Sequence, residues 1–588
     1  MPSRSRIFAA LAVVVVSALV VAVVVTRDDP EPAAQAGPVT TTTPPPPEAE
    51  PHVEAVVTID QRATDAALAV LDDGGTAADA AVTAAAVLSV VEPYYSNLIG
   101  GETAALYYDA ARQEVRSLDG VGFVGEEFSL DTYRGGQPFG LDQALVPGSW
   151  DGWMVLLAEH GELGLDRLLR PAIELARDGH VATAELQNQV VSALGAGSIN
   201  AAARAVYVPG GRAVRAGETV VQSDFAASLQ GIADVFAAAD SRTAGLRAAR
   251  DHVYRGPLGA ALTEAARAEG ATFTAADMAR FEATTGEAIS LEYDDVTVHQ
   301  TPPGTQGLTM LTALNTIEKA DLRPEDAASP DAAHLVIEAL KLAMADREEF
   351  VGDPAFTDVP VEALLSDDYG RQQLARIDPG SSIDAPIASG LDNTTTFQVV
   401  DAGGNAVAVT TSTGYQLQAA GSTGIMMNNR MRYMTATDPG SPNFLEPGKK
   451  VRYTGNPYIV TDADGALRLL GGTIGGDTQA QVQTQHVVNV LDFGLSAADA
   501  IARYRFVTQN TPGSIAPHRT PNQVRVETST PSDVVDSLRR RGQNVSLQSG
   551  SGPFGYGTMV VIGSGGRSAD LGVDPRVPTA AGVARPPG

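Results

Sequence analysis

Residues 392–401 read DNTTTFQVVD, and AGGN (402–405) and AVAV (406–409) follow them. Threonine and valine favour strands and Gly-Gly-Asn favours a tight turn, so this stretch predicts a β-hairpin with Thr394 at its head. Cutting the bond between Asn393 and Thr394 gives Thr394 a free α-amine beside its hydroxyl. An α-amine has a pKa of about 8 and can act as general base for that hydroxyl. One residue then supplies both nucleophile and base, although an ordinary Thr-rich hairpin edge has the same composition.

Other segments along the chain follow the order of a known family. Gly74-Gly75-Thr76-Ala77 opens a predicted helix, and Asn97-Leu98-Ile99-Gly100-Gly101 is a Gly-rich loop before a predicted strand. Shorter matching segments are Val146-Pro147-Gly148, Pro171-Ala172-Ile173-Glu174, Pro302-Pro303, Glu338-Ala339, Ala345-Asp346-Arg347, Gly352-Asp353-Pro354, Asn428-Asn429, Gly471-Gly472-Thr473-Ile474-Gly475-Gly476 and Asp574-Pro575-Arg576. Together with Thr394, these segments resemble the γ-glutamyltransferase (glutathione hydrolase) family of N-terminal nucleophile (Ntn) hydrolases.

The resemblance implies an α+β fold of four layers, in which two helix layers enclose two packed sheets (αββα). It also implies autocatalytic cleavage into a large helix-rich chain, residues 53–393, and a small strand-rich catalytic chain, residues 394–588. The two chains would stay together as an intramolecular heterodimer.

The hydrophobic periodicity agrees with this division, because helical patterns dominate the N-terminal two thirds and strand patterns the C-terminal third. Ser329 and Pro330 supply an N-cap and a first-turn proline for the longest helix. Helices are predicted over 65–71, 77–91, 187–194, 225–238, 258–268 and 330–350. Strands are predicted over 103–108, 296–300, 395–400, 406–411, 458–461, 467–470, 523–527 and 559–562.

The N-terminal segment predicts export. Two arginines precede an apolar run from Ile7 to Val25, whose 19 residues would rise about 28 Å as a helix, close to the bilayer core. Residues 1–26 are therefore predicted to be a single-span anchor, with a signal segment cleaved after Ala36 as the alternative. Residues 27–52, rich in proline and threonine, are predicted to be an extended linker. Either way, the rest of the chain is extracytoplasmic.

The chain carries a formal net charge of −29 and no cysteine. This acidic balance argues against nucleic-acid binding and against docking on anionic lipid. Without cysteine the chain has no disulfide, thiolate nucleophile or Cys-ligated metal. The eight histidines show no ligand spacing, and His334 is predicted to be a packed, hydrogen-bonded helix residue. No catalytic metal and no cofactor are expected.

Three segments match known motifs only formally. Gly120–Gly125 and Gly550–Gly555 fit the dinucleotide-binding pattern, but neither opens a clear helix in a βαβ unit, so both are predicted to be turns. Residues 462–465, Asp-Ala-Asp-Gly, lack the other ligands of a calcium loop and are predicted to form a hairpin turn.

The reaction that the resemblance implies is acyl transfer through a threonyl ester. Thr394 would attack an amide carbonyl, and water or an acceptor amine would then release the acyl group. Gly475 and Gly476 match the paired glycines whose backbone N–H groups bind the oxyanion in the family. Ser412 stands where the family has a threonine that hydrogen-bonds the nucleophile, and serine keeps the same hydrogen-bonding capacity. Thr396 shares a strand face with Thr394, which gives it a possible steering role.

At the donor-binding positions the chain departs from the family. The arginine that holds the donor's α-carboxylate corresponds to Val121, and an asparagine corresponds to Gly414. The acid that holds the α-amine corresponds to Tyr433, and a serine pair corresponds to Tyr453 and Thr454. Valine cannot replace the bidentate fork of arginine, so glutathione is not assured as the donor. Three other arginines are an alternative source of a cation for a substrate carboxylate, namely Arg430, Arg432 and Arg452.

Three functions fit these observations. The first is an exported hydrolase or transpeptidase of the γ-glutamyltransferase type, cleaved before Thr394 and acting on γ-glutamyl compounds such as glutathione. The second is an Ntn acylase that uses the same nucleophile on a different amide or peptide donor. The third is a catalytically inactive, surface-displayed binding protein with the same fold.

Overall fold

The structure, a computed structural model, describes residues 51–133, 140–383, 394–414, 416–516, 518, 521–550 and 552–587. Within this part of the chain, no helix is long and apolar enough to cross a bilayer. The predicted anchor, residues 1–26, lies outside the described residues, as do Asn393 and all but the last two residues of the predicted linker.

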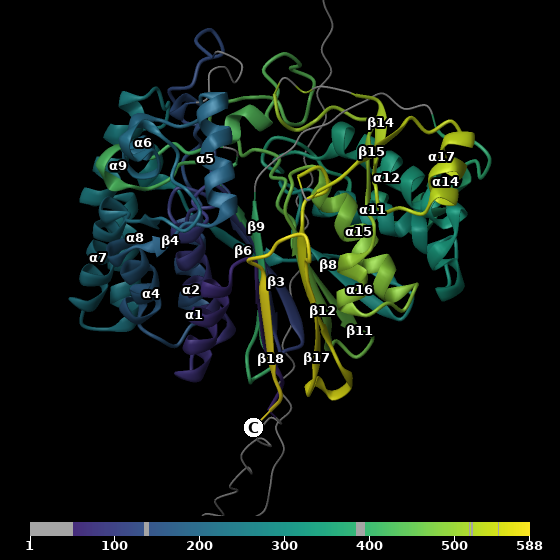
Figure 1. The fold of residues 1–588 in the computed structure, drawn as a ribbon, viewed down its shortest axis with the longest axis horizontal. Helices are drawn as coiled ribbons and strands as arrows, with labels where there is room; N and C mark the ends of the chain where they lie inside the picture. The colour runs from purple at the N-terminus through teal and green to yellow at the C-terminus, as the bar shows by residue number, and fades with distance from the viewer. Residues whose placement is uncertain are drawn as a thin grey trace, which may run out of the picture. The chain divides into compact units, whose positions relative to one another are not determined.

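Two antiparallel sheets pack face to face at the centre of the folded unit (Figure 1). The first has the strand order β18 (Ala581–Arg585), β1 (Glu54–Thr58), β9 (Thr395–Val400), β10 (Ala406–Ser412), β2 (Glu102–Asp109), β3 (Glu114–Gly120) and β6 (Thr284–Glu287). The second has the order β17 (Ala569–Val573), β16 (Gly557–Ile562), β12 (Leu467–Thr473), β11 (Tyr458–Asp462), β8 (Val296–Gln300) and β7 (Ile289–Tyr293). Apolar side chains from both sheets, among them Leu106, Val400, Ile459 and Leu470, form the core between them.

A layer of helices covers the outer face of each sheet (Figure 1). The first layer holds α1 (Gln61–Asp72), α2 (Ala77–Val91), α3 (Ser149–His160), α4 (Leu165–Asp178), α5 (Ala184–Ala196), α6 (Ala201–Tyr207), α7 (Ser223–Ala237), α8 (Arg242–Tyr254), α9 (Pro257–Ala268) and α10 (Ala275–Arg280). The second holds α11 (Gly307–Glu318), α12 (Pro330–Phe350), α13 (Val361–Leu364), α14 (Asp367–Ala375), α15 (Thr478–Leu491), α16 (Ala497–Ala502) and α17 (Ser532–Arg540).

Two smaller sheets belong to the helix layers. The strands β13 (Phe506–Gln509), β14 (Gln523–Glu527) and β15 (Val545–Gln548) form a three-stranded sheet that contacts α12, α15 and α17. The strands β4 (His180–Val181) and β5 (Thr219–Val220) form a short pair. The whole arrangement confirms the predicted four-layer αββα class.

Local signals in the sequence start the two central helices. Thr76 caps α2, because its hydroxyl accepts from the backbone N–H of Asp79 while the Asp79 carboxylate accepts from the N–H of Thr76. Ser329 caps α12 by accepting from the N–H of Asp331, and Pro330 occupies the first turn. Both caps satisfy N–H groups that a helix start otherwise leaves without partners.

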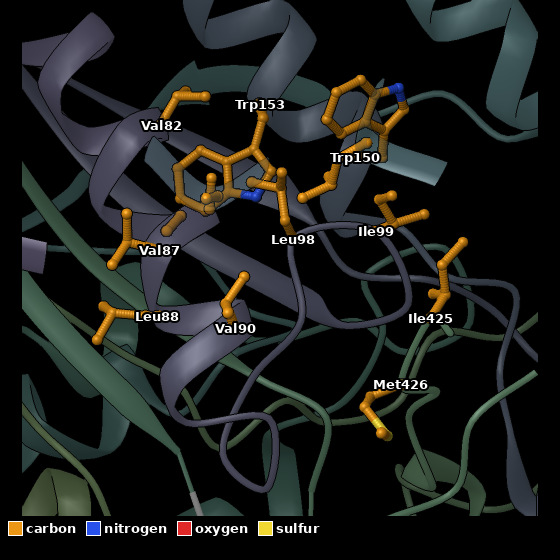
Figure 2. Close-up of a cluster of buried hydrophobic side chains, with 14 of the residues drawn as sticks. Val82, Val87, Leu88, Val90, Leu98, Ile99, Trp150, Trp153, Ile425 and Met426 are labelled. Atoms are coloured by element: carbon orange, nitrogen blue, oxygen red, sulfur yellow. The ribbon is translucent and has the colours of Figure 1, made fainter. Parts of the chain in front are cut away.

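The core of the first helix layer surrounds α2, every residue of which is buried. Figure 2 shows Val82, Val87, Leu88 and Val90 of this helix beside Leu98, Ile99, Trp150, Trp153, Ile425 and Met426. The indole of Trp153 also stacks on Phe397 of β9, with ring centroids 6.5 Å apart. This contact fixes the strand that begins at Thr394 against the helices, so the packing of α3 bears directly on the position of the candidate nucleophile.

Most predicted elements are confirmed, with shifts of a few residues at their ends. The hairpin turn at residues 462–465 joins β11 to β12, and residues 552–554 form a turn. The turn predicted at Gly120–Gly125 is wrong, because Gly120 ends β3 and Phe123 pairs with Lys450 in an antiparallel bridge. His334 is buried in α12 and its Nε2 lies 3.0 Å from the carbonyl oxygen of Asp378, as predicted. The sequence did not indicate β3, whose residues EVRSLDG have no apolar alternation, or α4, which contains Pro171.

Candidate active site

Thr394 stands at the end of a row of residues that crosses the first sheet. Thr395 pairs with Thr411, so the next position places Thr394 opposite Ser412. Ser412 pairs with Glu102, and continuing the pairing of Thr103 with Gly120 places Val121 beside Glu102. Side chains at paired positions project from the same sheet face.

This row lies on the face that meets the second sheet. Alternate residues of a strand project from the same face, so the row shares its face with Val400, Ala408 and Leu106. All three residues lie in the core between the sheets. Adjacent strands are about 4.8 Å apart, so Glu102 lies roughly 10 Å from Thr394 along the row. Thr394 is buried.

Thr396 lies on the same face but its hydroxyl is engaged by the protein. It donates to the carbonyl oxygen of Val409 at 2.9 Å and accepts from Nε2 of Gln398 at 3.3 Å. A Cβ atom on Gly472 of β12 would lie 2.2 Å from this hydroxyl, so glycine at 472 lets the two sheets approach. Thr396 therefore positions strands around the nucleophile.

Gln479, in the first turn of α15, contacts the candidate nucleophile. Its side-chain amide lies 3.5 Å from the Thr394 hydroxyl oxygen. The side-chain amide of Gln479 is oriented so that both its oxygen and its nitrogen have suitable hydrogen-bond partners. In this orientation the nitrogen donates to the carbonyl oxygens of Thr473 at 3.1 Å and Thr454 at 3.3 Å. The amide oxygen then faces the Thr394 hydroxyl. Gln479 thereby links the nucleophile to the second sheet.

Gly475 and Gly476 form the turn between β12 and α15. Their φ angles are +111° and +57°, and two consecutive left-handed residues are a conformation that glycine adopts without a Cβ penalty. In the described part of the chain, neither backbone N–H group donates a hydrogen bond. Both precede the N-terminus of α15, where the helix dipole favours negative charge. This arrangement suits a developing oxyanion.

A buried polar network holds this turn in place. The Nε2 of Gln306 donates to the carbonyl oxygens of Gly476 at 2.9 Å and Thr454 at 2.7 Å. Arg347 donates to Oε1 of Gln306 at 3.1 Å and to Asp477 at 2.6 Å. Burial alone would raise the pKa of Asp477, but the Arg347 guanidinium and hydrogen bonds from Ser514 hold it below its usual value.

Three of the positions predicted to differ from the family lie in one cluster. The residues Val121, Tyr433 and Tyr453 belong to one buried cluster beside the sheets, the apolar wall. The Arg430 guanidinium lies between the rings of Tyr433 and Tyr453, with its Cζ 4.5 and 4.8 Å from their centroids. The carbonyl oxygen of Thr454 is used by the network around Gln306 and Gln479.

Gly414 does not leave an empty space. Its φ is +91°, and a Cβ atom there would lie 1.9 Å from Oδ1 of Asn429. Both polar atoms of the Asn429 side chain are buried, and within the described residues neither has a hydrogen-bond partner. The backbone N–H of Asn429 donates to the carbonyl oxygen of Thr413 at 3.0 Å, which fixes the amide beside the end of β10.

Sequence reasoning did not identify Glu102, Gln306, Gln479 or Asn429 as site residues. Glutamine and asparagine carry no spacing signal of their own, and their roles here depend on contacts between segments far apart in the chain. For Glu102, a charged residue in an otherwise buried strand was the available signal.

Two packed antiparallel sheets between two helix layers are the four-layer αββα architecture of the Ntn hydrolases. A family model described as "Gamma-glutamyltranspeptidase" matches residues 63–584, and the chain belongs to that family. This confirms the family predicted from the sequence.

Relatives within the family carry two kinds of name. The chain is 30% identical to a "Glutathione hydrolase proenzyme" of Escherichia coli, over 84% of this chain and 86% of the relative. It is 31% identical to an "Acylase ACY 1 proenzyme" of a Pseudomonas species, over 83% and 87%. The solved cephalosporin acylase from Bacillus halodurans superimposes with a TM-score of 0.79 at 27% identity, covering 94% of this chain and 99% of that one.

Proposed function

We propose that this protein is an exported, autocatalytically cleaved hydrolase or transpeptidase in which Thr394 transfers the acyl group of a γ-glutamyl compound, such as glutathione, to water or to an amine. Cleavage before Thr394 divides the folded unit into chains 53–393 and 394–588. The apolar segment at residues 1–26 supports export. Family membership supports acyl-transfer chemistry.

One observation carries the proposal. The Gln479 amide lies 3.5 Å from the Thr394 hydroxyl oxygen, although 85 residues separate the two, and Gln479 stands in the first turn of α15, directly after the Gly475–Gly476 turn. A nucleophile and unengaged backbone N–H donors close to one another are the two parts that acyl transfer requires.

The chemistry follows from these groups. Hydrolysis of the bond before Thr394 consumes one water and leaves a carboxylate on one chain and an α-amine on Thr394. That amine takes the proton of the hydroxyl as the oxygen attacks the donor carbonyl, and the N–H groups of Gly475 and Gly476 stabilise the oxyanion. The proton passes to the leaving amine as the amide bond breaks. Water or an acceptor amine then cleaves the threonyl ester and restores the hydroxyl.

The test compares Thr394→Ala with Thr395→Val. Thr395 is buried on the opposite strand face and its hydroxyl has no hydrogen-bond partner among the described residues, so valine keeps its shape at little cost. We expect two bands on a denaturing gel and donor hydrolysis for the wild type and for Thr395→Val. We expect one uncut, inactive band for Thr394→Ala. An uncut wild type whose binding properties are unaffected by Thr394→Ala would favour the inactive binding protein.

A second candidate keeps Thr394 and changes the donor. Val121, Gly414 and Tyr433 replace the three residues that hold the amino-acid end of the donor in the family, and the first and third are packed into an apolar wall. Relatives named as acylases make an Ntn acylase the natural alternative. Equal hydrolysis of γ-glutamyl and glutaryl anilides would favour it.

A further inference from the structure

A buried ion pair lies in α12, outside the candidate active site. The charged groups of Glu338 and Lys341 are 2.9 Å apart, and their side chains are 0% and 1% exposed. Nζ of Lys341 donates to Oε1 of Gln543 at 3.0 Å, and Nε2 of Gln543 donates to Oε1 of Glu338. The chemistry proposed for Thr394 uses neither charge, so the pair calls for another explanation.

The pair holds a short stretch of backbone that belongs to no helix or strand. The N–H of Ile383 donates to Oε2 of Glu338 at 2.6 Å. Nζ of Lys341 donates to the carbonyl oxygen of Ile383 at 3.2 Å and to the hydroxyl oxygen of Ser382 at 3.3 Å. The N–H of Ser382 donates to the carbonyl oxygen of Arg541 at 2.7 Å. The ion pair and the backbone of Ser382 and Ile383 together form the anchor.

The energetics of a buried ion pair indicate that the anchor fixes a position more than it adds stability. Desolvation of two buried charges offsets most of their attraction, so such a pair contributes about as much stability as apolar residues of the same volume. Fixing one register of a chain is the best-attested use of buried ionic groups. Here the carboxylate accepts from the N–H of Ile383 and the ammonium group donates to its carbonyl oxygen. A slip of the segment by one residue, about 3.4 Å, would move both groups away from their partners.

The anchor lies between the two chains that the proposed cleavage would create. Its own residues belong to chain 53–393, whereas Arg541 and Gln543, which contact it, belong to chain 394–588. Ile383 is also the last described residue before Thr394, because residues 384–393 lie outside the described residues. The anchor is therefore the last fixed point that the structure describes on the segment leading to the scissile bond.

The helix α12 connects the anchor to the candidate active site. Arg347 follows Lys341 by six positions in this helix, a rise of about 9 Å along the helix axis. Its guanidinium donates to Asp477, beside the glycine turn, at 2.6 Å. The same helix thus holds the segment that leads to Thr394 and the turn that follows β12.

We propose that Glu338 and Lys341 are positioning residues for the cleavage before Thr394, because they hold the segment that carries the scissile bond. The inference rests on the proposed function of Thr394 and names what prepares its own cleavage. In that cleavage the Thr394 oxygen bonds to the carbonyl carbon of Asn393, the C–N bond breaks and the hydroxyl proton passes to the freed amine. Water then hydrolyses the ester. Such an attack requires the reacting atoms to lie about 3–3.5 Å apart in the right orientation, and a fixed approach of the segment supports that geometry.

The test compares the rate of cleavage with the stability of the full chain. Lys341→Met leaves the Glu338 charge buried without its partner, and Glu338→Gln/Lys341→Met removes both charges. The control is Arg250→Met, which leaves Asp151 buried without its partner in the first helix layer. Pulse–chase labelling and denaturing gels give the rate of cleavage. Urea unfolding gives the stability of each variant in the Thr394→Ala background, where every chain is expected to stay uncut.

Both anchor variants should be cut roughly 10- to 100-fold more slowly than the wild type, the effect of misplacing reacting groups by about 1 Å. The double variant should recover part of the urea midpoint that Lys341→Met loses, because no uncompensated charge remains. It should not recover the rate of cleavage, because neither charge then holds Ile383. Arg250→Met should lower the urea midpoint and be cut at the wild-type rate. Chains that complete the cut should have the wild-type kcat, because the anchor acts before the cut.

Hydrogen exchange measures the anchor directly. The amides of Ser382 and Ile383 should exchange faster in the double variant than in the wild type, and unchanged exchange would overturn the inference. Faster exchange together with a wild-type rate of cleavage would overturn it as well. So would a rate of cleavage that follows the urea midpoint through all variants, Arg250→Met included, because a purely structural role predicts that result.

A gel of the wild type separates this inference from the proposed function. A wild type that is cut before Thr394, together with anchor variants that are cut equally fast, overturns the role of Glu338 and Lys341 and leaves the nucleophile standing. A wild type that is uncut and inactive overturns both.

Discussion

The side-chain amide of Gln479 lies 3.5 Å from the hydroxyl oxygen of Thr394, although the two residues lie 85 positions apart in the chain. Thr394 directly precedes β9 of the first sheet, and Gln479 stands in the first turn of α15, directly after the glycine turn that follows β12 of the second sheet. The pair therefore joins the proposed nucleophile to the proposed oxyanion site, and its geometry depends on how the two sheets pack.

Replacing Gln479 by glutamate should reduce turnover without preventing folding. A carboxylate cannot donate to the carbonyl oxygens of Thr473 and Thr454, so we expect kcat to fall roughly 10- to 100-fold, the cost of losing a well-placed hydrogen bond to a charged or reacting group. Steady-state kinetics with γ-glutamyl anilide measure this. Gln485→Glu is the control, because Gln485 lies on the same helix and its Nε2 donates to the carbonyl oxygens of Gln481 in α15 and Phe506 in β13. Equal losses of kcat in both variants would contradict a role at the nucleophile.

Removing the buried Arg347 should destabilise the fold around the glycine turn. Arg347→Met leaves Asp477 buried without its ion-pair partner, a change that typically costs about 3–5 kcal/mol. Urea unfolding should show this loss. The double variant Arg347→Met/Asp477→Asn should recover part of it, because the uncompensated charge is then absent. An unchanged midpoint in the single variant would show that the network does not support the turn.

Restoring an asparagine at 414 should not restore a family-like contact. Gly414→Asn would place Cβ 1.9 Å from Oδ1 of Asn429 at a φ of +91°, so we expect a loss of about 1–3 kcal/mol from strain and displacement. The matched control is Gly217→Asn, where φ is +89° but no atom lies within 4 Å of the added Cβ. Thermal unfolding of both variants separates backbone strain from the clash. Equal Tm shifts would show that Asn429 yields without cost.

Asp492 should make stability fall as the pH rises. Burial raises its pKa to about 7, although hydrogen bonds from the Tyr293 hydroxyl oppose the shift. The unfolded value is about 4, so between these pH values the folded state binds the extra proton. The resulting stability is present below about pH 4 and is lost as the pH rises through about 7, by at most about 4 kcal/mol. Chemical unfolding at several pH values should show a flatter profile for Asp492→Asn than for the wild type. Parallel profiles would contradict the shift.

The sequence alone predicted those helix starts and turns that local signals determine. Ser329-Pro330 fixed the start of α12, and the residues at 462–465 fixed a hairpin turn, because caps and turns depend on a few neighbouring residues. Thr394, Gly475 and Gly476 were predicted as site residues through a resemblance that spans most of the chain, and their roles stay predictions. In the structure Gln479, three residues after Gly476, lies 3.5 Å from the Thr394 hydroxyl oxygen.

The rest of the site depends on long-range packing that the sequence does not encode locally. Glu102 joins the row of Thr394 only through the register of three strands. Gln479 and Gln306 bind backbone carbonyl groups of distant loops. Val121, Tyr433 and Tyr453 form the wall around Arg430 because they pack in one buried cluster. The resemblance indicates that the residue types at these positions differ from those of the family, but it does not indicate which residues they contact.

Intact-mass measurement and N-terminal sequencing of the purified, exported protein test the central claim most directly. The account predicts two fragments, the smaller of which begins with Thr394-Thr395-Thr396-Phe397, and only one uncut chain in Thr394→Ala. A correctly folded wild type whose bond before Thr394 stays intact throughout would contradict it.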